Sequence, residues 1–205
     1  MKFKTKDLIH ELKHHLPFTV FATAIAIIII ISFIYFLKQD ISETIFHVLH
    51  PLHIIASAIV TTAIFYKYKK NIFQAIIVGI FGALIIGSIS DIIFPYLGGK
   101  ILNLNLSFHL PLIEKPILIL SSAIVGSILG TFIKITKIPH AVHVSLSVLA
   151  SLFYILAFTP KISLLYFTGI LIVIIIAVII PCCTSDILFP FFFLGKRIKT
   201  CNCKH

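Results

Sequence analysis

Residues 50–95 read HPLHIIASAIVTTAIFYKYKKNIFQAIIVGIFGALIIGSISDIIFP, and this stretch decides the fold. Two apolar runs, 51–66 and 72–97, are separated by a short loop that carries Lys67, Lys69 and Lys70. A helix needs about 20 apolar residues to cross the roughly 30 Å hydrocarbon core of a bilayer. The stretch therefore predicts two membrane-spanning helices that run in opposite directions.

Four further apolar runs follow the same pattern, and they cover residues 17–37, 116–133, 139–158 and 162–190. With 59% hydrophobic residues and a mean hydropathy of +1.12, a chain of 205 residues has too little interior to hide its apolar side chains from water. The sequence therefore predicts an all-α integral membrane protein with six transmembrane helices. The second helix is short unless residues 45–50 extend it. We expect Pro51 and Pro139 to mark helix starts, because proline is well tolerated in the first turn.

Basic residues are distributed unevenly between these runs. Four of the 17 Lys and Arg residues fall on one side of the predicted membrane, namely Lys38, Lys100, Lys115 and Lys161. The other thirteen fall on the opposite side, which the positive-inside rule identifies as cytoplasmic. We therefore expect a multi-pass protein of the cell membrane with both termini in the cytoplasm. The net charge of +10 is dispersed over several loops, so it forms no face for nucleic acid.

An internal repeat divides the chain into two halves. HPLH at 50–53 recurs as HAVH at 140–143, and SDIIFP at 90–95 recurs as SDILFP at 185–190. The offset of 90 in the first pair continues from Ser57 to Ser147 and from Thr61 to Ser151, which places these polar residues on one narrow helical stripe. Because each half holds three helices, an odd number, the second half must cross the membrane in the opposite sense to the first.

The repeat and the charge pattern together predict the organisation of the chain. The predicted units are a cytoplasmic amphipathic basic leader (1–16), a first three-helix unit (17–97), an external loop (98–115), a second three-helix unit in inverted topology (116–190) and a basic Cys/His cytoplasmic tail (191–205).

The polar residues of the repeat form the candidate functional site. The principal residues are His50, His53 and Asp91 in the first unit and His140, His143 and Asp186 in the second, accompanied by Ser57, Ser90, Ser147 and Ser185. A carboxylate at membrane depth is costly and indicates function. Two histidines three residues apart share a helix face, where they can bind a metal ion or relay a proton. The topology places the first set toward the outer face and the second toward the cytoplasmic face, and it leaves open whether they form one central site or two terminal ones. Simpler interpretations are an aspartate that caps a helix and histidines that lie at the membrane interface.

Cysteines accompany the second half of the repeat. Cys182 and Cys183 precede the second Ser-Asp pair, and the tail offers Cys201, Cys203 and His205. Thiolates and imidazoles suit soft or borderline cations, so a divalent or soft transition-metal ion is the cofactor or substrate that this donor set would take. The alternative is that these cysteines are acylated or inert. The GSILG sequence at 126–130 is typical of close helix packing within a bundle.

These observations favour a small secondary transporter or channel for a cation, either a transition-metal ion or a proton. Its expected partners are the lipid bilayer and the small cation, and assembly into a homo-oligomer stays open. The sequence carries no P-loop, dinucleotide fingerprint, HExxH or GxSxG, so it indicates no catalytic residues and no organic cofactor.

Two other classes of function are weighed against transport. An intramembrane metal-dependent enzyme acting on a lipid-like substrate requires only one working cluster of ligands. A structural or accessory membrane subunit would tolerate alanine at the four histidines and both aspartates.

Overall fold

The computed structural model describes residues 17, 19–28, 30–32, 43–133, 137–160, 164–183 and 193, and for 137–140, 164 and 183 it describes only the backbone. Within these residues every regular element is helical and none is a strand. The basic leader and several predicted site residues lie outside the described part, namely Ser185, Asp186, Cys201, Cys203 and His205.

Apolar helices account for most of the described chain. Two are long and apolar enough to cross a membrane: α2 (Glu43–Tyr68) and the continuous helical stretch Ile72–Ile101, which consists of α3 (Ile72–Ser88), the π-helix η1 (Ile89–Ile93) and α4 (Phe94–Ile101). With 26 and 30 residues, they extend for about 39 and 45 Å at 1.5 Å per residue. The shorter apolar helices among the described residues are Thr19–Ser32, Pro116–Gly130, Ala141–Ala157 and Phe167–Cys182.

The elements of the second half are α6 (Pro116–Gly130), α7 (Lys137–Ala157), the 3-10 turn η2 (Leu164–Tyr166), α8 (Phe167–Val178) and the π-helix η3 (Ile179–Cys183). A short helix, α5 (Pro111–Glu114), precedes α6. Each π-helix extends the third long helix of its half, and the two begin at Ile89 and Ile179, which are 90 residues apart.

The two prolines that were expected to mark helix starts behave differently. Pro139 lies in the first turn of α7, which confirms the expectation for the second half. Pro51 lies inside α2, so the prediction of a helix start there is wrong. The helix begins eight residues earlier, at Glu43, because residues 45–50 extend it. Pro51 removes one backbone hydrogen bond from the helix, and packing against the neighbouring helices compensates for that loss. His50 and His53 consequently lie about two and three turns inside the helix rather than at its end.

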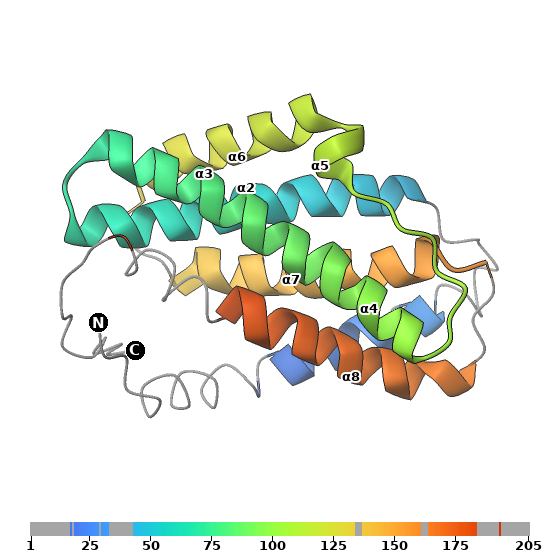
Figure 1. Ribbon diagram of the computed structural model, residues 1–205. Helices are drawn as coiled ribbons and strands as arrows, with labels where there is room; N and C mark the ends of the chain where they lie inside the picture. Colours follow the sequence, from blue (N-terminus) through green and yellow to red (C-terminus); the bar gives the residue numbers. More distant parts are fainter. Residues whose placement is uncertain are drawn as a thin grey trace.

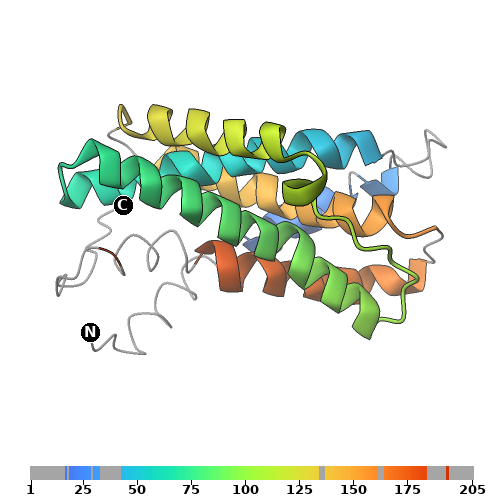
Figure 2. The ribbon, with the colours of Figure 1, turned by 45° about the horizontal axis from the view of Figure 1, so that its top comes forward.

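Helices α2 and α7 form the centre of the bundle and run side by side in opposite directions (Figures 1 and 2). Helices α3 and α6 pack against α2, while α8 packs against α7. The N-terminal helix Thr19–Ser32 joins the α7 side, since Ala26, Ile27 and Ile30 share one apolar cluster with Val144 and Ile170. Each half of the chain thus contributes one helix to the central pair.

Close packing around α2 depends on glycines of α6. A Cβ added to Gly126 would meet the backbone carbonyl of Ile55, and one added to Gly130 would lie 2.7 Å from the carbonyl oxygen of Ile59. Backbone atoms cannot move aside as a flexible side chain can, so only glycine permits this approach. The expectation that GSILG serves packing within the bundle is confirmed.

The bundle has large apolar side chains on its surface as well as in its core, and it also buries polar side chains. Large apolar side chains point outward, such as Phe73 (71% exposed), Ile101 (80%) and Ile117 (83%). Histidines, an aspartate and hydroxyl residues are buried in the interior. Buried polar groups need partners, so the interior must supply them from other helices.

Candidate cation site

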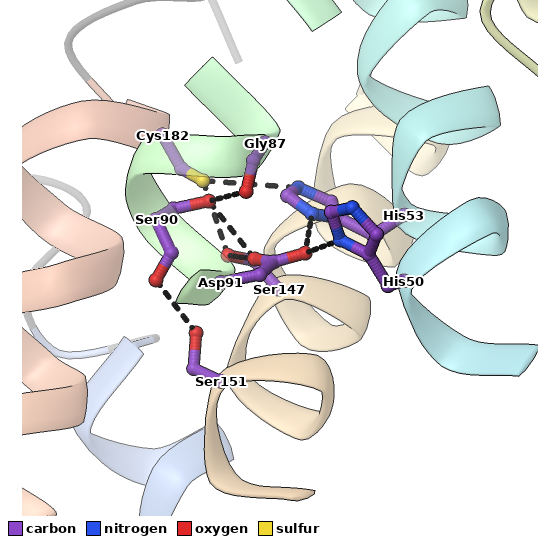
Figure 3. A network of polar contacts seen from close by, with 8 residues as sticks. All are labelled: His50, His53, Gly87, Ser90, Asp91, Ser147, Ser151 and Cys182. Atoms are coloured by element: carbon purple, nitrogen blue, oxygen red, sulfur yellow. Dashed lines mark hydrogen bonds and ion pairs between the residues drawn. The ribbon is translucent and has the colours of Figure 1, made fainter. Parts of the chain in front are cut away.

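Four helical elements converge at the centre of the bundle, where α2, η1, α7 and η3 each bring polar side chains to one place (Figure 3). The residues are His50, His53, Ser90, Asp91, His143, Ser147, Ser151 and Cys182, and the exposed fraction of every one is 0%. Both halves of the chain therefore contribute to a single, fully buried polar cluster, which we call the central site.

The carboxylate of Asp91 is the hub of the central site. The Nδ1 atoms of His50 and His53 lie 2.8 and 2.6 Å from its Oδ2. The hydroxyls of Ser90 and Ser147 donate to its Oδ1 over 2.9 and 3.1 Å. A carboxylate can only accept, so both imidazoles carry their hydrogen on Nδ1 in this arrangement. Four donors on two oxygens satisfy the buried charge with charge-assisted hydrogen bonds.

The backbone beside Asp91 is shaped by the SDIIFP motif. In η1 the N–H of Phe94 donates to the carbonyl of Ile89, five residues back. The carbonyl of Ser90 would then need an N–H at position 95, where Pro95 has none. The hydroxyl of Ser151 on α7 donates to this carbonyl over 3.0 Å instead. The proline thus leaves a backbone acceptor next to the carboxylate, and the other half of the chain satisfies it.

A thiol and a third imidazole lie on the other side of His53. The Sγ of Cys182 lies 3.7 Å from His53 Nε2 and 3.1 Å from the Ser147 hydroxyl. The ring of His143 stacks on that of His53, with centroids 4.7 Å apart and planes 12° from parallel. His53 therefore uses one nitrogen toward Asp91 and the other toward Cys182.

Two sets of potential ligands share His53. One set is His50, His53 and Asp91, and the other is His53, His143 and Cys182. Within each set the ligand atoms lie within 4.8 Å of one another. Tetrahedral coordination with bonds of roughly 2.0–2.3 Å places ligand atoms about 3.3–3.8 Å apart. Side-chain movements of about 1 Å would therefore bring either set onto a metal ion.

Aromatic side chains cover the central site next to His50. The ring of Phe46 is fully buried and stacks on the imidazole of His50, with centroids 5.5 Å apart. Tyr154 and Phe158 contact Phe46 edge-on, at centroid distances of 5.2 and 5.5 Å. We call Phe46, Tyr154 and Phe158 the aromatic cap. It separates the central site from the loop that carries His109, whose ring stacks on Phe158 at 4.2 Å.

The structure brings together residues that the topology had separated. His143 was expected near the face opposite to His50, His53 and Asp91, but it stacks directly on His53. Of the accompanying serines, Ser90 and Ser147 bind Asp91, whereas Ser57 is buried on the same stripe of α2 as the two histidines. His140 lies in the first turn of α7, where only the backbone is described.

Two features of the central site were not predicted. Sequence reasoning did not identify the π-helix, and it noted Ser151 in the stripe without placing it in the site. The signal for both was Pro95, five residues after Ser90. It has no N–H to donate to the carbonyl of Ser90, so the helix is irregular at this point and the carbonyl needs a donor from another helix.

Comparison of the chain with protein-family models, with curated proteins and with solved structures gives no match in any of the three.

Proposed function

We propose that this chain is a multi-pass transporter that carries a cation through the central site of a six-helix membrane bundle. The observation that carries the proposal is the central site itself. Donors from both halves of the chain meet on one carboxylate that has no contact with solvent. An ionisable residue of this kind inside a membrane bundle marks an ion pathway more often than a structural contact.

The packing supports two inverted three-helix units. The central helices α2 and α7 carry the corresponding His motifs and run in opposite directions (Figure 1). The first helix of each unit packs on the second helix of the other, since α6 contacts α2, and Thr19–Ser32 shares a cluster with α7. Inverted repeats of this kind build transporters whose site lies at the interface between the repeats. The excess of basic residues in the predicted cytoplasmic segments then orients both termini inward.

The chemistry of the site favours a cation. The described side chains of the central site are one carboxylate, three imidazoles, one thiol and hydroxyls, with no Lys or Arg among them. Carboxylate, thiol and hydroxyl groups can all present lone pairs to a positive ion, and each neutral imidazole can do so through the nitrogen that carries no hydrogen. An anionic solute would meet the negative charge of Asp91, which already takes the four nearest donors.

An intramembrane metal-dependent enzyme is the second candidate. It is favoured by the convergence of the described ligands into one site, because such an enzyme needs only one metal centre. Against it, the eight residues of the central site are completely buried. A lipid-like substrate requires an open approach from the bilayer, whereas a bare ion can pass a narrow route.

Uptake into sealed vesicles tests the proposal. The purified full-length protein is reconstituted, and the entry of Zn²⁺, Co²⁺ and Mn²⁺ and the movement of protons are followed with fluorescent indicators. We expect metal uptake by the wild type and its loss in Asp91→Asn and Asp186→Asn. Glu114→Gln is the matched control, since Glu114 is an exposed carboxylate that pairs with His109 and should leave uptake unchanged.

The other outcomes distinguish the alternatives. Full uptake in both aspartate variants, with the proteins folded, would remove the proposal. Metal binding without uptake would favour the enzyme, and proton movement without metal entry would identify the proton as the substrate. Unchanged behaviour after alanine replacement of the site histidines and both aspartates would point to a structural subunit.

A further inference from the structure

We propose that the cation is a borderline or soft transition-metal ion, with Zn²⁺ as the model, bound by His53 Nε2, the imidazole of His143 and the thiolate of Cys182. This inference rests on the proposed function and names its substrate class and its ligands. It also assigns separate roles to the two ligand sets that share His53.

The hydrogen-bond network selects the set that contains the thiol. An ion bound by His50, His53 and Asp91 through the atoms that now meet would displace the hydrogens on both Nδ1 atoms and break two hydrogen bonds of 2.8 and 2.6 Å. An ion bound by His53 Nε2, His143 and Cys182 leaves all four hydrogen bonds to Asp91 in place. The second mode therefore loses less of the existing network.

Asp91 prepares His53 for this role. By accepting a hydrogen bond from Nδ1, the carboxylate fixes the tautomer in which Nε2 carries a lone pair, and Nε2 is the atom that faces Cys182. A carboxylate behind a ligating imidazole orients the ring and raises its basicity. Asp91 is thus a positioning residue for the metal, and Ser147 links the two parts by donating to Asp91 and contacting Cys182.

Binding exchanges one bond for another at Cys182. The S–H bond breaks, its electron pair forms the bond from Sγ to the metal, and the proton leaves to water. Two imidazole nitrogens and one thiolate leave a fourth tetrahedral position for water or another ligand. Sulfur and nitrogen donors in this ratio select Zn²⁺, Co²⁺ or Cu⁺ over the hard ions Mg²⁺, Ca²⁺ and Mn²⁺.

Cobalt is the probe for this arrangement. Co²⁺ is titrated into the purified full-length protein in detergent, and absorption is recorded in the near-ultraviolet and visible ranges. We expect a sulfur-to-cobalt charge-transfer band together with the intense visible bands of tetrahedral Co²⁺. Cys182→Ser should remove the charge-transfer band and weaken Co²⁺ binding by at least about tenfold.

The neighbouring thiols supply matched controls. Cys183→Ser and the double variant Cys201→Ser/Cys203→Ser should keep the band, because the proposal assigns it to Cys182 alone. His143→Gln tests the second ligand, and it should weaken binding while the charge-transfer band survives at saturating Co²⁺. Thermal unfolding of each variant separates loss of a ligand from loss of the fold.

Two results would overturn the assignment. One is a charge-transfer band that persists in Cys182→Ser. The other is binding of Mn²⁺ as tight as that of Co²⁺, abolished by His50→Gln and unaffected by Cys182→Ser, which would place the ion in the other ligand set. Vesicle uptake without the band would leave transport standing and remove the thiol ligand. The band without uptake would leave the metal site standing and remove transport.

Discussion

Replacement of Asp91 by alanine and by asparagine should separate its structural role from its role in ion binding. Four donors point at the carboxylate, two imidazole N–H groups and two serine hydroxyls. In Asp91→Ala the hydroxyls can turn toward backbone carbonyls, as Ser90 already does toward Gly87. The two N–H groups have no such freedom and are left without an acceptor.

The expected cost follows from these donors. An unpaired buried donor costs about 1–3 kcal/mol, so two imidazole N–H groups give a loss of about 2–6 kcal/mol in the free energy of unfolding of Asp91→Ala. In Asp91→Asn the amide oxygen can face both imidazoles, while the hydroxyls rotate to accept from the amide nitrogen. We therefore expect asparagine to recover most of the lost stability but none of the uptake, because the negative charge is gone.

Unfolding of the detergent-solubilised protein, monitored by circular dichroism against temperature or denaturant, gives the stability difference. Glu114→Ala serves as the control, because that carboxylate is exposed and bonds only at the surface, to His109 and to the Leu110 N–H, so its loss should cost about 1 kcal/mol or less. Equal stability of Asp91→Ala and the wild type would refute the four-donor arrangement. So would an asparagine variant as unstable as the alanine variant.

Three further predictions concern the surroundings of the central site. Ser147→Ala should weaken Co²⁺ binding about 10–100-fold by loosening the support of Asp91, whereas Ser145→Ala should not, because the Ser145 hydroxyl bonds only to a carbonyl of its own helix; competition with a fluorescent chelator measures both. Gly126→Ala should lower the free energy of unfolding by about 1–3 kcal/mol or more, since its Cβ would meet the Ile55 carbonyl, and an unchanged unfolding midpoint would contradict the packing of α6 on α2. Phe46→Leu removes the ring that stacks on His50, and it should accelerate removal of bound Co²⁺ by an added chelator in a stopped-flow experiment; an unchanged rate would show that the aromatic cap is no barrier.

The sequence predicted one polar stripe of the interior, and the reason is periodicity. His50, His53, Ser57 and Thr61 were assigned to one stripe of a helix, and all four are buried in α2. The helical class of the described chain follows equally from the length and composition of its apolar runs. Helical periodicity and the length of an apolar run involve residues that are close in the sequence, so a single sequence is enough to detect them.

Distances across the bundle could not be predicted in the same way. The contact between His53 and His143 depends on how far α2 extends before it meets α7. Because the sequence prediction began this helix at Pro51 and not at Glu43, it placed His50 and His53 too near the end of the helix. The π-helix η1 depends on Ser151 of α7, whose hydroxyl donates to the carbonyl of Ser90. Both features result from pairs of residues far apart in sequence, which local periodicity does not register.

The way in which α6 lies on α2 limits how this chain can be divided. A cut in the connection between α4 and α6 would yield two fragments, each lacking one of the helices that cover its own central helix. Gly126 and Gly130 would face no backbone in one fragment, and the carbonyls of Ile55 and Ile59 would lose their cover in the other. Separately expressed halves should therefore be recovered only when they are produced together, as an intertwined pair.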